Sequence, residues 1–253
     1  MRLVDGALAI RDDLPTASTV LVDVPLEAGE SQGTKVARFS SLQLVRDRQA
    51  LALSRLDDWA LTIGGDCGVE LASISHVADS QEIAVLWFDA HPDLNTPESS
   101  PSAAFTGMVL RTLIGDGEPG LVPAHPIAPG RILLVGARSF DDAESDYAAS
   151  AGIRSFTPDE ATVDALVAAI EASGATSVYV HVDLDVLDPA EFGGIGYPEP
   201  FGVETTALTG LIRGVRERFA LAGAGITEFA PADAAQAADD LPTILRIIGA
   251  LTA

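Results

Sequence analysis

Cysteine, aromatic side chains, basic residues and long apolar runs are all scarce in this sequence of 253 residues. With a single cysteine, Cys67, the chain cannot form an internal disulfide, which is consistent with a reducing compartment. Because no run approaches about eighteen uninterrupted apolar residues, we expect no membrane span. The N-terminal stretch MRLVDGALAIRDD is too acidic and too poor in apolar residues for a signal peptide, so we expect a cytoplasmic protein.

Basic residues are outnumbered, because 15 Lys and Arg stand against 37 Asp and Glu, for a formal net charge of -22. Such an acidic surface repels nucleic-acid phosphates and anionic membranes, so we expect neither as a partner. It favours solubility, and attraction of a cationic substrate is a second reading of the same charge. Apolar residues make up 47% of the chain, which is enough for the core of one large domain spanning residues 1–253.

Short apolar runs alternate with amphipathic segments along the chain. The runs are continuous, as in strands that are covered on both faces, and the alternation predicts a three-layer α/β/α fold around a mainly parallel sheet. Two segments rich in Pro, Gly and Ser, residues 92–106 and 186–204, are expected to be long loops of the kind that often carry function. The expected strands are residues 18–24, 59–65, 82–90, 131–137, 176–185 and 223–229, and the expected helices are residues 41–56, 67–78, 157–174, 205–220 and 241–251.

The expected helix at residues 157–174 has the clearest end signals. Thr157 can be its N-cap, Pro158 lies in the first turn, and Glu160 completes a capping box. Gly174 is expected to end the helix.

Acidic side chains follow several of the expected strands, at the sheet edge where open parallel α/β folds bind ligands. Asp89, His91 and Asp93 follow one strand, and Asp183 and Asp185 follow another. Alternate residues of an extended chain share a face, so each set can point one way. Either motif alone also fits a polar turn, but together they indicate a cation that relieves the repulsion of crowded carboxylates.

Carboxylate and imidazole donors suit a borderline divalent ion, and manganese is the natural candidate. Bridging carboxylates would allow two ions about 3.5–4 Å apart that share an activated hydroxide.

Five motifs in the order GGDCGVE, FDAHPDLNTP, GARSFDDAE, VDLDVLDP and ITEFAP resemble the arginase–agmatinase–formiminoglutamase (ureohydrolase) family. They span residues 64–231, and NTP and GARSFDDAE are more similar to arginases than to agmatinases. The resemblance implies an α/β/α fold, a two-manganese centre that hydrolyses guanidino or formimino groups, and a homo-oligomer, trimeric or hexameric.

The resemblance also assigns site residues. It implies that Asp89 and Asp183 bridge the two ions and that Asp93 passes a proton from the attacking hydroxide to the departing amine. It implies that Glu228 pairs with a guanidinium. Five residues match metal ligands of the family, namely Asp89, His91, Asp93, Asp183 and Asp185. Four match positions that hold the amino-acid end of the substrate, namely Asn95, Ser100 and Ser102 for the α-carboxylate and Asp141 for the α-amino group.

Three positions depart from the family pattern. Cys67 stands where the first metal ligand is usually a histidine; it is either a thiolate ligand, which shifts the preference toward zinc or iron, or a small buried thiol that leaves one site weak. Thr106 stands where arginases carry a histidine thought to shuttle protons. His181 replaces a small hydroxyl residue and is an added ligand, a hydrogen-bond partner of a carboxylate or a packed core histidine.

These observations favour a metal-dependent hydrolase of a guanidino or amidino C–N bond in a small amino-acid-like substrate, with release of urea. One alternative is a relative that hydrolyses formiminoglutamate or a guanidino acid. The other is an impaired paralogue that binds metal or ligand without turnover. One ion, or a divalent metal other than manganese, is compatible with Cys67.

Overall fold

The structure is a computed structural model that describes residues 2–252. Within this range, six strands form one sheet in the order β1-β6-β5-β2-β3-β4, and the paired strands run parallel. The parallel α/β fold expected from the sequence is therefore confirmed. The strands are β1 (Leu61–Ile63), β2 (Ile83–Phe88), β3 (Ile132–Val135), β4 (Arg154–Phe156), β5 (Ser177–Asp183) and β6 (Ala220–Thr227).

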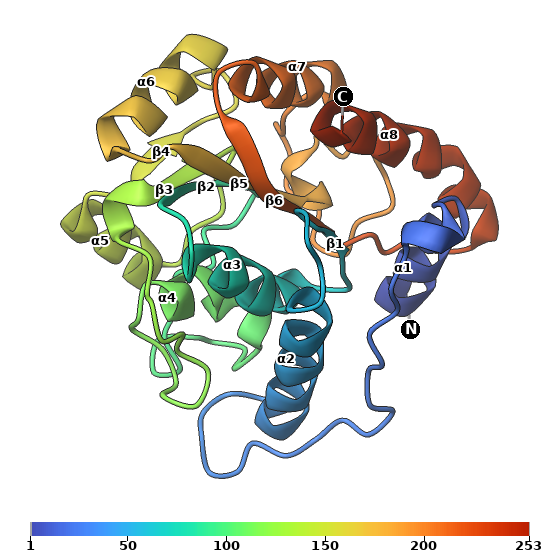
Figure 1. The fold of residues 1–253 in the computed structure, drawn as a ribbon, viewed down its shortest axis with the longest axis vertical. Coiled ribbons are helices and arrows are strands. Elements are labelled where there is room, and N and C mark those ends of the chain that lie inside the picture. Colours follow the sequence, from blue (N-terminus) through green and yellow to red (C-terminus); the bar gives the residue numbers. More distant parts are fainter. Residues whose placement is uncertain (1, 253) are drawn as a thin grey trace.

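Helices cover both faces of the sheet (Figure 1). One face carries α1, α6, α7 and α8, whose apolar residues share a core with alternate strand residues. The other face carries α2, α3, α4 and α5. The helices are α1 (Arg2–Asp12), α2 (Phe39–Leu53), α3 (Glu70–Ala78), α4 (Val109–Leu113), α5 (Asp142–Ala151), α6 (Val163–Ser173), α7 (Thr205–Arg216) and α8 (Ala234–Thr252).

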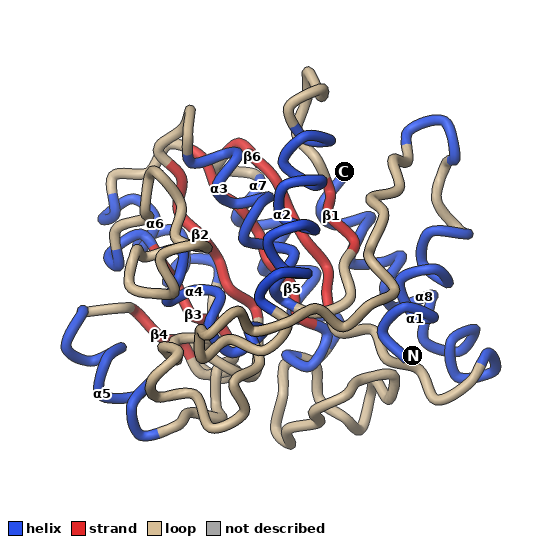
Figure 2. The backbone as a smooth tube through the Cα atoms, turned by 90° about the horizontal axis from the view of Figure 1, so that it is seen from below, coloured by secondary structure: helices blue, strands red, loops and turns tan. Residues whose placement is uncertain are grey.

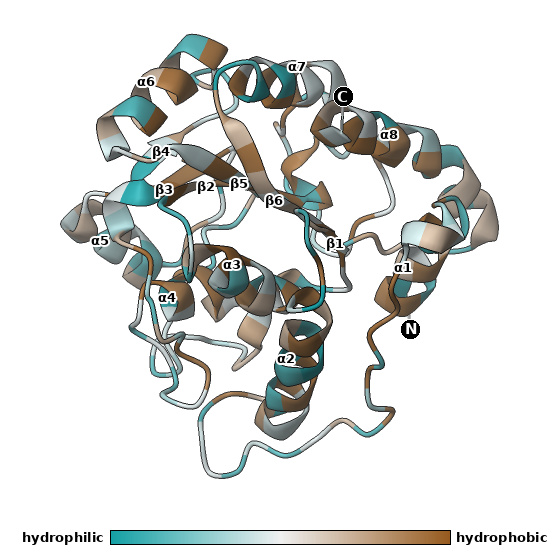
Figure 3. Cartoon of the chain, viewed as in Figure 1, coloured by the Kyte–Doolittle hydropathy of each residue, from teal (hydrophilic) through white to brown (hydrophobic). Residues whose placement is uncertain are grey.

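Strand β2 shows why its sequence is apolar without interruption. Leu86 and Phe88 pack into one core, and Val85 and Trp87 pack into the core on the other side of the sheet. Successive side chains of a strand point to opposite faces, so a central strand buried on both faces needs apolar residues throughout. In Figure 3 the central strands are mainly brown, whereas α6 and α7 alternate brown and teal around their axes, as helices with one buried side do.

The predicted strand at residues 18–24 is wrong. Residues 19–25 are irregular and run along the outside of the molecule between α1 and α2 (Figure 1), away from the edges of the sheet. Val20 and Val24 are each 64% exposed, because an apolar run that reaches no neighbouring strand has nothing to bury it. Strand β4 was not predicted, since Arg154–Phe156 is short and mixed in polarity.

The predicted start of the helix at residues 157–174 is also wrong, although its end is right. Helix α6 begins at Val163, and the hydroxyl of Thr162 accepts from Ala165 N at 3.2 Å. The Thr157–Glu160 pair forms its own turn upstream, in which Glu160 Oε2 accepts from Thr157 N at 3.1 Å. Gly174 has φ of +75°, the left-handed conformation that ends the helix where the sequence predicts.

In Figure 2 the strands run side by side through the molecule, and long loops lie at its periphery. None of the helices within residues 2–252 combines the length and the apolar character that crossing a bilayer requires.

Candidate metal centre

The carboxyl ends of β2, β5 and β6 bring the predicted acidic motifs together. Phe88 of β2 lies opposite Val182 of β5, and Asp183 lies opposite Thr227 of β6. The backbone N–H of Ala90 donates to Asp185 Oδ1 at 3.0 Å, which ties the two motif-bearing segments directly to each other. The convergence predicted from the parallel topology is thus present in the structure.

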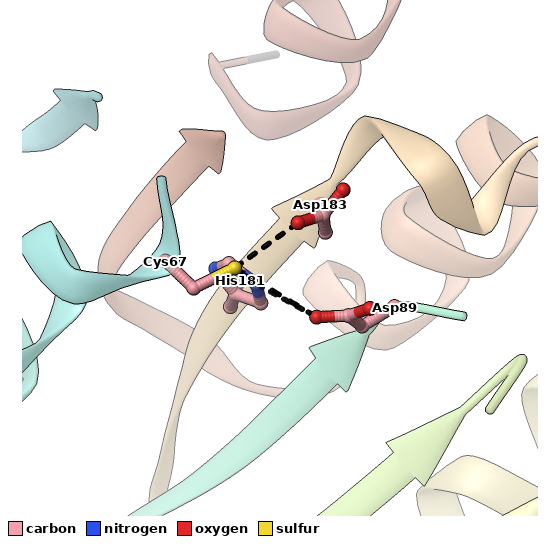
Figure 4. A group of neighbouring side chains, drawn as sticks. All are labelled: Cys67, Asp89, His181 and Asp183. Carbon is pink, nitrogen blue, oxygen red and sulfur yellow. Dashed lines mark hydrogen bonds and ion pairs between the residues drawn. The ribbon is translucent and has the colours of Figure 1, made fainter. Parts of the chain in front are cut away.

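Four buried side chains form what we call the cysteine cluster, namely Cys67, Asp89, His181 and Asp183 (Figure 4). His181 and Asp183 come from β5, Asp89 follows β2, and Cys67 comes from the segment after β1. Cys67 Sγ lies 3.0 Å from Asp183 Oδ2 and 3.7 Å from His181 Nε2. The same nitrogen lies 3.7 Å from Asp89 Oδ2. Each of the four is 2% exposed or less.

Local backbone structure fixes these side chains. The carboxylate of Asp66 accepts from Gly68 N at 2.9 Å and so caps the short 3₁₀ helix, Cys67–Val69, that presents the thiol. Asp183 Oδ1 accepts from Asp185 N at 2.8 Å in the same way. Trp87 Nε1 donates to Asp89 Oδ2 at 3.0 Å. The acids are therefore held in place without help from a bound ion.

A second group, the His91 cluster, consists of Asp89, His91 and Asp185. His91 Nδ1 lies 3.0 Å from Asp185 Oδ2 and 3.5 Å from Asp89 Oδ1. Asp89 belongs to both clusters and turns a different oxygen to each, Oδ2 to the cysteine cluster and Oδ1 to the His91 cluster. A carboxylate so placed can bridge two ions.

The acids of this region raise one another's pKa values. Burial, followed by the neighbouring carboxylates of Asp185 and Asp89, holds the pKa of Asp183 well above its usual value. Burial and Asp89 raise the pKa of Asp185 to about 6. Asp89 is the exception: burial opposes its charge, but hydrogen bonds with His181 and His91 outweigh burial and lower its pKa. The raised pKa values of Asp183 and Asp185 mean that the surrounding protein disfavours their charged forms. A bound cation would stabilise those charges.

Asp93 is held differently from the other predicted ligands. It is buried with φ of +51°, a left-handed conformation that a non-glycine residue adopts only when its surroundings enforce it. It belongs to neither cluster, and among residues 2–252 its Oδ2 has no hydrogen-bond partner. That oxygen is available to a ligand or a proton.

Comparison with known proteins assigns the chain to a family. Residues 13–245 match the family model "Arginase: Arginase family". The chain belongs to the arginase family. It is 32% identical over 211 residues to the N(omega)-hydroxy-L-arginine amidinohydrolase of Streptomyces lavendulae, covering 81% of this chain and 74% of that one. It is 30% identical over 198 residues to the arginase of Bacillus caldovelox, covering 70% and 66%.

Solved structures agree with this assignment. The arginase of Entamoeba histolytica in complex with L-ornithine superposes with a TM-score of 0.81 at 26% identity, covering 91% of this chain and 82% of that chain. The arginase of Bacillus cereus gives 0.79 at 27% identity, covering 87% and 80%. In sequence, the matched part spans less than two thirds of some relatives, 66% of the Bacillus caldovelox arginase and 52% of the Bacillus subtilis arginase.

The predicted substrate residues of this arginase-family chain fall into two groups. Asn95 Nδ2 donates to Asp141 Oδ2 at 2.9 Å, so the structure joins these two. The hydroxyls of Ser100 and Ser102 lie 3.5 Å apart, and each accepts from a backbone N–H of its own loop. These hydrogen bonds stabilise the loop. Contact of Ser100 and Ser102 with a substrate stays a prediction.

Glu228, the predicted partner of a guanidinium, follows β6 and is 5% exposed with φ of +63°. Its backbone N–H donates to Gly65 O at 2.7 Å, which anchors it beside the segment that carries Cys67. Burial, followed by Asp66 and the two acids Asp185 and Asp89, raises its pKa to about 8. A cation beside Glu228 would restore its charge.

Sequence reasoning missed Glu144, which braces the loop after Asp93. Its Oε1 accepts from Leu94 N at 2.9 Å, and its Oε2 accepts from Asp141 N at 3.0 Å. One carboxylate therefore ties the loop after Asp93 to the start of α5. The signal was present, because an Asp followed by a Glu three residues later is a capping-box pattern.

Replacement of Glu144 tests this brace. We expect Glu144→Ala to lower the free energy of unfolding in urea by about 1–3 kcal/mol, because it leaves the buried N–H of Leu94 unpaired and removes the acceptor of Asp141 N. Glu160→Ala is the matched control, since Glu160 makes the same type of bond at an exposed turn and its loss should be smaller. Equal losses for the two variants would show that Glu144 does not brace the site.

Proposed function

We propose that this protein is a metal-dependent hydrolase of a guanidino or amidino C–N bond in a small substrate with an amino-acid end, and that it releases urea. The observation that carries the proposal is the pair of adjacent clusters that share Asp89. Family membership supports the reaction type, since the relatives include arginases and an N(omega)-hydroxy-L-arginine amidinohydrolase. The trimeric or hexameric state and the cytoplasmic location remain predictions.

The residues present suit a pair of divalent ions. Each cluster offers donor atoms that lie within 4.8 Å of one another, and the oxygens of Asp89 face both. Asp93 interacts electrostatically with Asp89 and His91, and its Oδ2, which has no hydrogen-bond partner within residues 2–252, offers a further donor. We propose that Cys67, Asp89 and Asp183 hold one ion and that Asp89, His91, Asp93 and Asp185 hold the other, with manganese as the expected metal.

Divalent ions bound here would lower the pKa of water, so that hydroxide is available near neutral pH to attack the planar amidine carbon. Glu228 would orient the cationic group by charge-assisted hydrogen bonds. Asp93 would take up a proton on the carboxylate oxygen that does not hold the ion and return it to the departing amine. Thr106 cannot titrate near neutral pH, which leaves Asp93 as the proposed proton carrier. The Asn95–Asp141 pair would hold the amino-acid end of the substrate.

A substrate screen tests the proposal. The protein loaded with Mn²⁺ or Zn²⁺ should release urea from L-arginine or a guanidino acid, hydroxyurea from N(omega)-hydroxy-L-arginine, or formamide from formiminoglutamate. Elemental analysis of the same samples should find two ions per chain. No product with any divalent metal would overturn the proposal. It would favour a paralogue without turnover, a reading that Cys67 and Thr106 keep open.

Glu228 offers a separate test of substrate orientation. We expect Glu228→Gln to raise KM for the cationic substrate roughly 10–100-fold, because a neutral amide cannot form a charge-assisted pair. The metal content should stay unchanged. Glu199→Gln, which removes a charge from the loop at residues 186–204, is the control. An unchanged KM for Glu228→Gln would remove Glu228 from substrate binding.

A further inference from the structure

We propose that His181 is a metal ligand and that the cysteine cluster is a thiolate–imidazole site for a thiophilic ion such as Zn²⁺, so that the centre holds two different metals. The inference rests on the proposed function in one respect, that the two clusters bind divalent ions. It adds a ligand from a strand position where the resemblance places only a small hydroxyl residue.

The spacing of the donor atoms supports this assignment. Zn–S and Zn–N or Zn–O bonds of ordinary length, set at tetrahedral angles, place donor atoms roughly 3.3–3.6 Å apart. In the cysteine cluster, Sγ lies 3.0 Å from Asp183 Oδ2, 3.7 Å from His181 Nε2 and 3.8 Å from Asp89 Oδ2. Asp89 Oδ2 and His181 Nε2 are 3.7 Å apart. These four distances lie within a few tenths of an ångström of that range, and the donor atoms of all four residues lie within 4.8 Å of one another, as a four-coordinate site requires.

The surroundings of His181 orient its ring for this role. The ring is fully buried and stacks on Trp87, its cross-strand neighbour, with 3.6 Å between the ring centroids. Nε2 faces the cluster, and Nδ1 lies 3.4 Å from Glu70 Oε1 on the far side. Neither atom has a hydrogen-bond partner within residues 2–252, but a carboxylate oxygen at this distance favours the proton on Nδ1 by its charge, which leaves the Nε2 lone pair for a metal.

Glu70 argues against a histidine that is merely packed in the core. Its side chain is fully buried, its Oε2 accepts from Tyr179 OH at 2.5 Å, and its Oε1 has no hydrogen-bond partner within residues 2–252. A Cβ at Gly225 would overlap Oε1, so the strand beside Glu70 carries the residue that leaves room for it. A buried carboxylate is costly unless it is paired, and an imidazole bound to a cation is such a partner.

The two clusters differ in donor chemistry. The cysteine cluster offers one sulfur, one nitrogen and carboxylate oxygens, whereas the His91 cluster offers one nitrogen and carboxylate oxygens only. Sulfur favours Zn²⁺, Co²⁺ or Fe²⁺ over Mn²⁺, while a site rich in oxygen accepts Mn²⁺. When Zn²⁺ is limiting and Mn²⁺ is abundant, the cysteine cluster should therefore take the zinc and leave the His91 cluster to Mn²⁺.

Cobalt absorbance tests the ligand set without recourse to activity. Titration of the metal-free protein with Co²⁺ should give a near-ultraviolet thiolate-to-cobalt band that saturates at one ion per chain, together with visible bands of a tetrahedral ion. Cys67→Ser should abolish the near-ultraviolet band. His181→Ser should keep that band, weaken Co²⁺ affinity at least roughly 100-fold and alter the visible bands. An unchanged affinity and visible spectrum would show that His181 is not a ligand.

Two further variants separate binding from packing. His76→Ser removes an exposed histidine from α3 and should leave the titration unchanged. Glu70→Gln keeps the size of the side chain but weakens the orientation of His181, so Co²⁺ affinity should fall roughly 10–100-fold while the near-ultraviolet band persists. Wild-type affinity in Glu70→Gln would overturn the positioning role of Glu70.

A measurement on the unaltered protein guards against variants that fail to fold. After addition of one molar equivalent of Zn²⁺ followed by an excess of Mn²⁺, elemental analysis should find one of each per chain, and zinc-edge X-ray absorption should show one sulfur and imidazole scattering. Two Mn²⁺ per chain, or zinc without sulfur, would overturn the inference. If amidine hydrolysis proceeds with two Mn²⁺, the proposed function survives without it. If the mixed centre forms but no amidine is hydrolysed, the inference survives and the proposed function falls.

Discussion

The Asp89→Ala variant is expected to retain neither ion of the centre and to lose amidine hydrolysis by roughly 10³-fold or more, because metal ions supply several kcal/mol of transition-state stabilisation. Asp89 Oδ2 faces the cysteine cluster and Oδ1 faces the His91 cluster, so one truncation removes a donor from each. Elemental analysis after dialysis against a fixed free metal concentration, together with the urea assay, checks the result.

Two further variants serve as comparisons for the loss of metal and activity in Asp89→Ala. Asp183→Ala should also strip metal and activity, although Asp183 belongs to the cysteine cluster alone and its loss can leave the His91 cluster partly filled. Asp239→Ala removes an exposed acid from α8 and should behave as wild type. Circular dichroism of the metal-free variants checks folding, since Trp87 Nε1 and His91 N lose their acceptor in Asp89→Ala. Retention of two ions by Asp89→Ala would exclude a shared bridging ligand.

The metal-free protein is expected to lose several kcal/mol of stability as the pH rises from 5 to 9. Burial and neighbouring acids raise the pKa of Asp185 to about 6 and that of Glu228 to about 8. An acid whose pKa is raised on folding binds more protons in the folded state between its ordinary and its raised value, so stability falls with pH across that interval.

His91 acts in the same direction. Burial favours its neutral form, but Asp185 and Asp89 outweigh burial and raise its pKa to about 11. The stabilisation from a charged His91 is complete below its ordinary pKa of 6.5 and declines as the pH rises above it. The lowered pKa of Asp89 matters only at acid pH, outside this window.

Urea denaturation of metal-free protein at pH 5, 7 and 9 measures this dependence. Saturating Zn²⁺ and Mn²⁺ should reverse the slope, because cations bind the ionised carboxylates and are released as those carboxylates take up protons. Metal-free stability that rises from pH 5 to pH 9 would show that the acids are not crowded in solution as they are in the structure.

The strand positions were predictable where burial alone determines residue type. A strand covered on both faces favours an unbroken apolar run, and β2 shows one (IAVLWF), whereas β5 is equally buried but is interrupted by His181 (SVYVHVD). The same signal failed at residues 18–24, because an apolar run reports a preference for burial and not the presence of a neighbouring strand. It failed at β4 for the opposite reason, since an edge strand of three residues needs little apolar surface.

The candidate site was predictable as far as parallel topology determines it. Acids at the carboxyl ends of neighbouring parallel strands must meet, so the approach of Asp89 to Asp183 and Asp185 followed from the sequence. The contact between Glu70 and His181 did not. Glu70 lies on α3 and His181 on β5, more than 100 residues apart in the sequence. Only the packing of α3 against the sheet brings the two side chains together.

Trp87 gives the molecule its own optical reporter. Its indole stacks on His181 and donates a hydrogen bond to Asp89, so it touches two residues of the cysteine cluster. The chain has two tryptophans, and Trp59 precedes β1, at the amino end of the sheet. An ion that enters the cysteine cluster alters the immediate electronic environment of one fluorophore and leaves the other as an internal reference. Entry of an ion into the cysteine cluster can therefore be followed by tryptophan emission, without labelling the protein.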